Sequence, residues 1–586
     1  MSATQAATCP GGGTSKEADT VGTLFSAFDI ARSGMAASQA QLDTAGHNIA
    51  NVNTEGFSRQ RVELETRAPI NRPYGQLGRG VNLRGVERVR DAFLDEAYRR
   101  SAPGLGQAEL ESSFYAQIED KFLEPEDNAF GQRLDGWFQA LNDFASDVDK
   151  LPQRQSVVSE AESLTQFINQ THRRLDDLRL DANAEVRNAS VEINDLAEGI
   201  AKLNNKIRNV EGGGRTANDF RDQRDLLLDK LSKIADISVN ERESGEVNVL
   251  IGEESLVYGD QAREVEAFRQ SDLDSVGIHQ NFYQLRFSDT EEAVPPGNGK
   301  LGGALRMRDE ILPEVMGDLD TIARGLIQGI NGVHSQGRGL EAITGVLESG
   351  VQVEDPSAPL ADQTPFDVTS GSFDIAVYEE GAEEGVTTEI AVDANASLED
   401  LAGSLNAVDG VSAQVSDGRL AIEAEEGRSF HFLNDSSNVL VAAGLNGLLT
   451  GTGAADINID QRISANPALL SSGYSADLGD DGDNRAALDL ADVEETGILK
   501  DGQATISEFY STMIAELGTD TRSSLQTRDL EQSFLDDFQR RREEVSGVSL
   551  DEEVAALLMY QRAFEASTRV MTTTDRMLEA LMGIVQ

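Results

Sequence analysis

Cysteine is nearly absent from this chain of 586 residues, which carries a single one, Cys9. One cysteine cannot form a disulfide within the chain. The five histidines are scattered, so no group of cysteine and histidine has the spacing of a zinc site. We therefore expect no metal and no cofactor. Stability must come from packed cores, for which a hydrophobic content of 39% is sufficient.

Positive charge is also scarce. The chain has 50 Lys and Arg residues against 102 Asp and Glu residues, which gives a formal net charge of -52 at pH 7. The phosphates of nucleic acids and of anionic lipids would repel such a chain, so the composition argues against both as partners. A large negative charge is instead typical of a protein that stays soluble in a salty environment.

Long apolar runs and catalytic motifs are missing as well. No run has the length of a transmembrane helix, and the first residues lack the charged start and apolar core of a conventional signal peptide. The glycine triplet 212–214 is not followed by the Gly-Lys-Ser/Thr of a phosphate loop. The acidic loop 477–483 is a poor EF-type calcium loop, because Gly479 and Leu488 fall where ligands are needed. We expect no catalytic, cofactor-binding or metal-binding residues.

Both ends of the chain carry a heptad repeat of apolar residues. Near the N-terminus the repeat comprises Phe28, Met35, Leu42 and Ile49, and the positions three residues further on are Ala31, Ser38, Ala45 and Val52. At the C-terminus the repeat comprises Leu550, Leu557, Phe564, Met571, Leu578 and Val585, and the alternate positions are Val554, Gln561, Thr568, Asp575 and Met582. The pattern predicts two long helices with a coiled-coil-like seam, which pair with each other or with other chains.

The two seams differ in character. Small residues on the N-terminal seam allow a partner helix to come close. Polar residues in the middle of the C-terminal seam cost stability but fix the register and the choice of partner. We therefore interpret both seams as assembly surfaces. An ordinary amphipathic core helix at each end is the simpler alternative.

Cap signals bound these two helices. Asn51 and Asn53 follow the N-terminal heptads and are natural helix-ending residues, and Gly56 permits a turn that a side chain would resist. At the other end, Ser549 and Glu552 have the spacing of a capping box that starts the last helix.

The residues around the first cap resemble a known family. The run His47-Asn48-Ile49-Ala50-Asn51-Val52-Asn53-Thr54-Glu55-Gly56-Phe57-Ser58-Arg59-Gln60 is similar to the N-terminal signature of the axial proteins of the bacterial flagellum, which are the rod, hook and hook-associated proteins. Its Ser-Arg-Gln extension is most like the hook-associated proteins of the hook–filament junction. The run 546–553 is similar to the start of their last helix. The chain departs from the pattern at Glu55, where the family has Pro, and at Phe57, where it has Tyr.

This resemblance implies a structural protein and not an enzyme. It implies self-assembly into a ring at the hook–filament junction, and a requirement for this ring in filament assembly. The implied partners are further copies of the chain, the hook protein, the next hook-associated protein, an export chaperone and the type III export apparatus. The implied location is extracellular, on the flagellum. Another axial protein, of the hook or distal rod, is the alternative, and a secreted enzyme or adhesin on a helical scaffold is a distant one.

The predicted fold class is mainly α with β insertions, in several domains. The predicted parts are a disordered extension at 1–20, a terminal helical coiled-coil domain at 21–60 plus 546–586, an extended arm at 61–104, a helical body at 105–349 plus 461–545 with a β element at 236–300, and a β-rich inserted outer domain at 350–460. Because axial proteins begin only a few residues before their first helix, we also expect translation to start at Val21.

Two charged runs receive local interpretations. The run Asp222-Gln223-Arg224-Asp225 also resembles the family, and we expect it to form local ion pairs. The run Arg540-Arg541-Arg542-Glu543-Glu544 is expected to be a solvated helix face.

Overall fold

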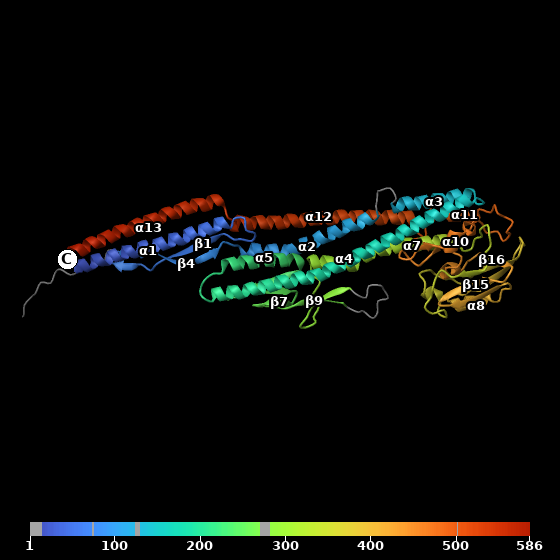
Figure 1. Ribbon diagram of the computed structural model, residues 1–586, viewed down its shortest axis with the longest axis horizontal. Coiled ribbons are helices and arrows are strands. Elements are labelled where there is room, and N and C mark those ends of the chain that lie inside the picture. The colour runs from blue at the N-terminus through green and yellow to red at the C-terminus, as the bar shows by residue number, and fades with distance from the viewer. Residues whose placement is uncertain (1–14, 73–74, 123–128, 270–281, 501, 586) are drawn as a thin grey trace, which may run out of the picture. The chain divides into compact units, whose positions relative to one another are not determined.

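A computed structural model describes residues 15–72, 75–122, 129–269, 282–500 and 502–585 of the chain (Figure 1). The predicted fold class is confirmed, because the chain is mainly α-helical with several small β-sheets. None of the described helices combines the length and the apolar character needed to cross a membrane. The chain forms two compact units. The first comprises residues up to Leu110, Ala184–Ala304 and residues from Thr527, and the second comprises Glu111–Asn183 and Leu305–Gln526.

In the first unit the two ends of the chain lie side by side (Figure 1). The N-terminal helix α1 (Ser15–Ala50) packs along the C-terminal helix α13 (Leu550–Val585), as the heptads predict. α1 begins six residues earlier than predicted, because residues 15–20 of the expected disordered extension are helical. The rest of that extension, 1–14, lies outside the described residues.

The α1–α13 contact depends on small residues, as predicted. Ala31, Ser38 and Ala45 of α1 are all buried. The two helices come close at Gly34, since a Cβ atom there would lie 3.0 Å from Ser567 Oγ. Small side chains let the two backbones come close, and the half-buried apolar residues of the heptads fill the space beside them.

After α1 the chain forms an arm of two antiparallel hairpins. Its strands are β1 (Gln60–Thr66), β2 (Ile70–Arg72), β3 (Gly75–Leu77) and β4 (Val81–Arg88), with β1 paired to β4 and β2 to β3. The arm lies against α1. Gly80 has a φ of 87° there, and a Cβ atom on it would lie 2.1 Å from Ser33 Oγ, so only glycine fits.

The predicted arm was wrong in its end point, residue 104. The helix α2 (Ala92–Phe122) already begins at Ala92, where the Asp91 side chain accepts the Phe93 N–H at 2.9 Å. Pro103 and Gly106 both lie inside α2, although both residue types disfavour a helix interior. Gly106 serves a close helix contact, because a Cβ atom there would lie 2.0 Å from the Lys233 carbonyl oxygen.

The rest of the first unit joins helices to small sheets. The helices are the C-terminal part of α4 (Leu151–Glu211), α5 (Asn218–Ile234) and α6 (Lys300–Arg306), and the strands are β5 (Ile237–Glu241), β6 (Val247–Ile251), β7 (Glu254–Tyr258), β8 (Gln261–Ala262), β9 (Val265–Arg269) and β10 (Tyr283–Phe287). The buried Asn204 of α4 fixes the four-stranded sheet, since its Nδ2 donates to the carbonyls of Val247 and Gly259. The predicted β element at 236–300 thus contains the expected strands.

The second unit has a helical core with a β-rich insertion. Its helices are α3 (Phe130–Ser146), the first part of α4, the π-helix η1 (Met307–Ile311), α7 (Leu312–His334), α11 (Arg485–Asp492) and the first part of α12 (Ile506–Ser546). α3 buries an apolar stripe that includes Trp137 and Phe144. The buried Arg154 of α4 donates to the carbonyl of Leu470 and to Ser472 Oγ, which fixes the chain after the insertion.

Two three-stranded antiparallel sheets form most of the insertion. One contains β13 (Val386–Val392), β12 (Gly371–Glu379) and β16 (Arg428–Leu433), and the other contains β11 (Val346–Glu348), β15 (Arg419–Ala424) and β14 (Val411–Ser416). Short elements complete it: η2 (Leu360–Asp362), α8 (Leu398–Leu405), α9 (Val439–Ala443), β17 (Leu449–Thr450), β18 (Asn458–Ile459), α10 (Gln461–Ala465) and η3 (Pro467–Leu469). Ser397 caps α8 in a capping box with Asp400. The second sheet includes β11, which precedes the predicted boundary at 350.

The acidic loop after the insertion uses its carboxylates internally. Asp483 Oδ2 accepts the N–H groups of Tyr474 and Ser475, and both of its oxygens bind Arg485. These donors hold the pKa of Asp483 well below its usual range, the Arg485 side chain having the largest effect.

Candidate assembly site

The signature residues form the base of the α1–α13 pair, within the first unit. Asn48 is buried near the end of α1 and exchanges two hydrogen bonds with the backbone of Gln60, each 3.0 Å long. Phe57 packs edge-on against His47 at 5.4 Å between ring centroids. Gly56 has a φ of 78° and would place a Cβ atom 3.2 Å from Leu226 Cβ, so it allows the turn to lie against α5.

Ser58 and Gln60 connect this turn to the first two turns of α5. The N–H of Ser58 donates to Asp222 Oδ2 at 2.9 Å, and its Oγ donates to Oδ1 at 2.7 Å. Gln60 Nε2 donates to Asp219 Oδ1 at 2.7 Å, and its Oε1 accepts from Asn218 Nδ2 at 3.3 Å. Two signature residues thus position the helix that follows the glycine triplet.

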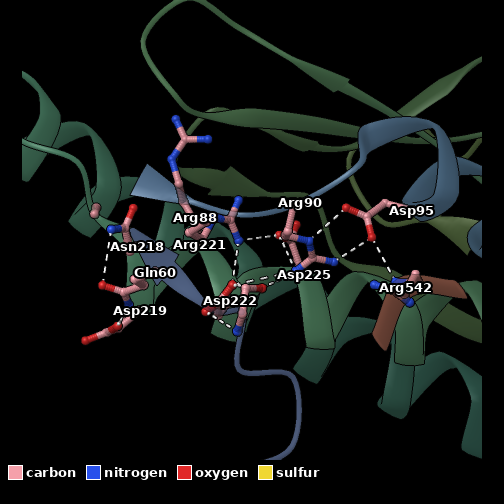
Figure 2. Close-up of polar contacts among 12 residues, drawn as sticks. Gln60, Arg88, Arg90, Asp95, Asn218, Asp219, Arg221, Asp222, Asp225 and Arg542 are labelled. Atoms are coloured by element: carbon pink, nitrogen blue, oxygen red, sulfur yellow. Dashed lines mark hydrogen bonds and ion pairs between the residues drawn. The ribbon is translucent and has the colours of Figure 1, made fainter. Parts of the chain in front are cut away.

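Beside Ser58 lies a cluster of four arginines and four aspartates, which we call the Arg–Asp cluster (Figure 2). Its members are Arg88, Arg90, Asp95, Arg99, Asp222, Asp225, Asp229 and Arg542. None of these side chains is more than 14% exposed. The charges balance, so this buried group carries little net charge although the whole chain is strongly acidic.

Shared contacts join the members of the cluster. Arg88 Nη1 lies 2.7 Å from both Asp222 Oδ1 and Asp225 Oδ2. Arg90 binds Asp95 through two nitrogens at 2.7 and 2.8 Å, as Figure 2 shows. On the other side, Arg542 of α12 reaches Asp95 Oδ1 at 2.8 Å, and its Nη2 lies 2.9 Å from Asp229 Oδ2. The cluster therefore joins the arm, α2, α5 and α12.

Burial and arginine charge act in opposite directions on the two central carboxylates. Burial would raise the pKa of Asp225, but the charges of Arg90, Arg88 and Arg99 outweigh it and hold that pKa well below its usual range. Burial raises the pKa of Asp222, and the Arg88 charge and the Ser58 donors oppose that rise only in part. Asp225 is therefore the firmly ionised centre of the cluster.

Arg59 joins the signature to the start of α13. Its backbone N–H donates to the carbonyl of Ser546, the last residue of α12, at 2.8 Å. Its side chain donates from Nε to Glu553 Oε1 at 2.7 Å and from Nη1 to Glu552 Oε2 at 3.0 Å. Glu552 N–H lies 3.5 Å from Ser549 Oγ, so one half of the predicted capping box is present, while the Glu552 carboxylate binds Arg59.

The predicted seam residues differ in how far their side chains are exposed. The side chains of Phe28, Met35, Leu42, Ile49, Leu557, Phe564, Met571 and Leu578 are half-buried. Leu550 and Val554 are 49% and 48% exposed, and the side chain of Val585 lies outside the described residues. Among the other signature residues, Asn51 is half-buried, whereas Ala50, Asn53, Thr54 and Gly56 are exposed.

The prediction that the alternate heptad positions of the C-terminal helix lie on the seam was wrong for the contact with α1. Val554, Gln561, Asp575 and Met582 are exposed, and Thr568 is half-buried. The residues one position earlier face α1 instead, namely Glu553, Tyr560, Ser567 and Thr574, of which Glu553 and Thr574 are buried. Both series repeat every seven residues, and hydrophobicity favoured Val554 over the charged Glu553. A polar seam was thus correctly expected, but one residue out of place.

Both interpretations of the charged runs were also wrong in part. Asp222 and Asp225 form ion pairs with distant arginines and not with local ones. In the run 540–544, Arg540 and Arg541 are exposed and bind Asp537, but the side chain of Arg542 is only 12% exposed and belongs to the Arg–Asp cluster. Sequence reasoning also missed Arg88, Arg90, Asp95, Arg99 and Glu553 as site residues. Only the arginine triplet within an otherwise acidic chain hinted at such a cluster.

The contacts of this site are structural. The carboxylates of the cluster bind arginines of the same chain, and these contacts join segments that are far apart in sequence. Among the described residues, no group of three or more His, Cys, Asp or Glu side chains is placed to hold a metal ion. The site can fix the angle and the register of the terminal helices.

Comparison with known proteins supports this interpretation. Residues 115–346 match the flagellar hook-associated protein FlgK helical domain, residues 539–584 match the flagellar basal body rod FlgEFG protein C-terminal family, and residues 28–57 match the flagella basal body rod protein family. The two rod-type matches cover α13 and most of α1 with the turn that follows it. The chain is therefore an axial protein of the bacterial flagellum.

Relatives of the full length identify the family within that class. The flagellar hook-associated protein 1 of Salmonella typhimurium is 26% identical over 581 residues, which are 96% of this chain and 100% of that protein. Its counterpart in Bacillus subtilis is 26% identical over 96% of this chain and 98% of its own length. The chain belongs to the family of flagellar hook-associated proteins, and it is a structural component of the flagellum.

One solved structure is similar over a shorter length. The flagellar hook junction protein FlgK from Burkholderia pseudomallei covers 77% of this chain and 100% of its own, with a TM-score of 0.49 and 14% identity.

Proposed function

We propose that the chain self-assembles into a ring at the hook–filament junction and that filament assembly requires this ring. The observation that carries the proposal is the paired terminal helices, held at their base by the signature residues and the Arg–Asp cluster. The curated relatives, which match from end to end, are named hook-associated protein 1, which supports the junction over other axial positions. The seams leave apolar residues of α13 exposed for neighbouring chains, among them Leu550, Val554 and Met559.

In this role the chain works by packing and has no catalytic step. Its partners are further copies of itself, the hook protein and the next hook-associated protein. An export chaperone and the type III export apparatus would deliver it to an extracellular position on the flagellum. The rigid base would transmit torque between hook and filament, because the cluster joins the arm, α2, α5 and α12 without a flexible link.

Deletion in the source bacterium tests the junction role. We expect hooks without filaments by electron microscopy, and flagellin shed into the medium, both restored by the intact gene on a plasmid. Loss of the hook itself would move the protein to the hook or distal rod, the alternative that the rod-type matches at both ends favour. Normal flagella would contradict the proposal.

A seam variant tests whether the terminal helices carry assembly. Leu557→Asp with Phe564→Asp places two charges on the half-buried face of α13. We expect folded protein that fails to enter the flagellum, because burying unpaired charge opposes packing. Ala563→Asp with Ala566→Asp, at exposed positions of the same helix, adds the same two charges and is the matched control, which should assemble. Normal filaments with the first variant would count against assembly through this seam.

A further inference from the structure

The apolar packing between α1 and α13 does not by itself select one register of the two helices. The larger residues of both helices repeat every seven positions, and so do the smaller ones that face them. Sliding α13 by one heptad, about 10 Å, would therefore bring the apolar heptad positions of the two helices together again, with Tyr560 or Thr574 in place of Ser567 beside Gly34. Something other than apolar packing must distinguish the native register.

Glu553 is the exception to this repetition. It occupies the position that Tyr560, Ser567 and Thr574 hold in later heptads, and it is 3% exposed. A buried carboxylate must find donors, and here it finds two. Arg59 Nε lies 2.7 Å from Oε1, and Asn48 Nδ2 lies 3.1 Å from Oε2. Both donors belong to the signature.

The donors of Glu553 are themselves fixed in place. Asn48 is held by its two hydrogen bonds to the backbone of Gln60, and the Arg59 backbone binds Ser546. They therefore cannot follow a sliding helix. A slip of one heptad would separate the Glu553 carboxylate from both donors and leave a charge buried without a partner, which is strongly unfavourable.

We propose that Glu553 sets the register in which the two ends of the chain pair, with Arg59 and Asn48 as its receptors. It is a specificity-determining residue of the pair. The neighbouring Glu552 also binds Arg59, but its side chain is 65% exposed, so it loses little when the contact breaks. The consequence for the flagellum rests on the proposed function: one register gives every copy in the ring the same terminal surface.

Disulfide trapping reads the register directly. A Cβ atom on Gly34 would lie 3.8 Å from Ser567 Cβ, which is within the range of disulfides, so Gly34→Cys with Ser567→Cys reports the native register. Gly34→Cys with Tyr560→Cys or with Thr574→Cys reports a slip of one heptad in either direction. Cys9→Ser removes the natural thiol from all of these chains.

The short link between α12 and α13 also restrains sliding and must be relaxed first. A Gly-Ser insertion of seven residues after Gly547 achieves this, since only residues 547–549 separate the two helices. In this lengthened chain Glu553 is kept or changed to Leu. Asp551→Leu is the matched control, which removes the same charge from an exposed position that contacts neither Arg59 nor Asn48 in any hydrogen bond or ion pair described above. The purified full-length chain is oxidised mildly, and the disulfides are mapped by mass spectrometry.

With Glu553 present we expect the native disulfide to exceed the slipped ones by about tenfold or more, because slipping leaves a buried charge unpaired. Glu553→Leu should bring the ratio of native to slipped disulfides close to one while helix content by circular dichroism is kept, and Asp551→Leu should behave as the parent. An unchanged ratio in Glu553→Leu would overturn the proposal, as would slipped disulfides in the parent.

A second variant covers the case in which leucine disturbs the fold. Glu553→Gln keeps the size and one acceptor but loses the charge, so its ratio should fall between the parent and Glu553→Leu. A parent-like ratio in Glu553→Gln together with lost helix content in Glu553→Leu would also overturn the proposal. The disulfides are mapped in the purified chain, so their result does not depend on whether deletion of the gene removes filaments from the bacterium.

Discussion

At the scale of single residues, His334 shows how burial fixes a protonation state. This last residue of α7 is fully buried, and both of its ring nitrogens are used. Nδ1 lies 2.8 Å from the carbonyl oxygen of Asn446 and must donate, whereas Nε2 lies 3.1 Å from the N–H of Ser471 and must accept. The neutral ring satisfies both contacts. A second proton on Nε2 would face an N–H group.

This geometry predicts a loss of stability in acid for the second unit. Burial lowers the pKa of His334 to about 4, from an ordinary value near 6.5, so the unfolded chain binds more protons between these two values. Stability is therefore complete above pH 6.5 and falls as the pH drops toward 4, by about 2 kcal/mol at pH 5.

Hydrogen exchange of α7 amides at pH 7 and pH 5, corrected for the intrinsic rate, measures the effect. The protection of α7 should fall on acidification in the parent chain. His334→Asn should show lower protection at pH 7 but a smaller pH dependence, whereas a change at the partly exposed His172, His172→Gln, should keep the parent's pH dependence. Equal pH dependence in His334→Asn and the parent would contradict the assignment.

At the scale of elements, glycines inside helices differ in whether they serve a close contact with a neighbouring element. Gly106 of α2 and Gly46 of α1 are both helical, but their surroundings differ. A Cβ atom on Gly106 would lie 2.0 Å from the Lys233 carbonyl oxygen at the end of α5, whereas one on Gly46 would have no atom within 4 Å.

Alanine at these two positions should act in opposite directions. Gly106→Ala should push α2 from α5 and destabilise the first unit by about 1–3 kcal/mol, as overpacking does. Gly46→Ala should be neutral or stabilising by up to about 1 kcal/mol, because alanine is the better helix former. Hydrogen exchange of α2 and α5 in both variants measures the difference. Equal protection in the two variants would show that α2 can move away without cost.

The elements also show what could be predicted from the sequence. Periodic signals are local, so the two terminal helices and the strand-containing regions 236–300 and 350–460 could be predicted. The start of α2 at Ala92 could not be predicted from local signals, since Pro103 and Gly106 disfavour this helix by propensity and only tertiary contacts, such as that of Gly106 with Lys233, explain their place in it. The Arg–Asp cluster was missed for the same reason: Arg542 and Asp229 are 313 residues apart, and nothing local marks them as partners.

At the scale of the whole molecule, the dominant quantity is the net charge of -52. The charge is spread unevenly. Within the first unit the buried Arg–Asp cluster is balanced, whereas between residues 351 and 460 the only Lys or Arg residues are Arg419 and Arg428. Exposed carboxylates there repel one another over a distance that salt shortens, from about 10 Å at 0.1 M to about 3 Å at 1 M. Buried pairs are screened much less.

Salt should therefore stabilise this protein, and the β-rich insertion most of all. Raising NaCl from 0.1 to 1 M should increase the melting temperature by several degrees, because repulsion between like charges is relieved while the buried ion pairs persist. Changing four exposed glutamates of the insertion to glutamine should raise the melting temperature at 0.1 M and reduce its dependence on salt. The four are Glu380, Glu384, Glu425 and Glu426.

Differential scanning calorimetry of both chains in NaCl, and in sucrose as an uncharged control, separates screening from general exclusion effects. Sucrose should raise both melting temperatures by the same amount, whereas NaCl should raise the melting temperature of the parent chain more than that of the variant. A melting temperature that falls with NaCl would mean that exposed ion pairs outweigh the repulsion. In that case the excess of carboxylates would have to serve something other than solubility, because its electrostatic cost would already be compensated at low salt.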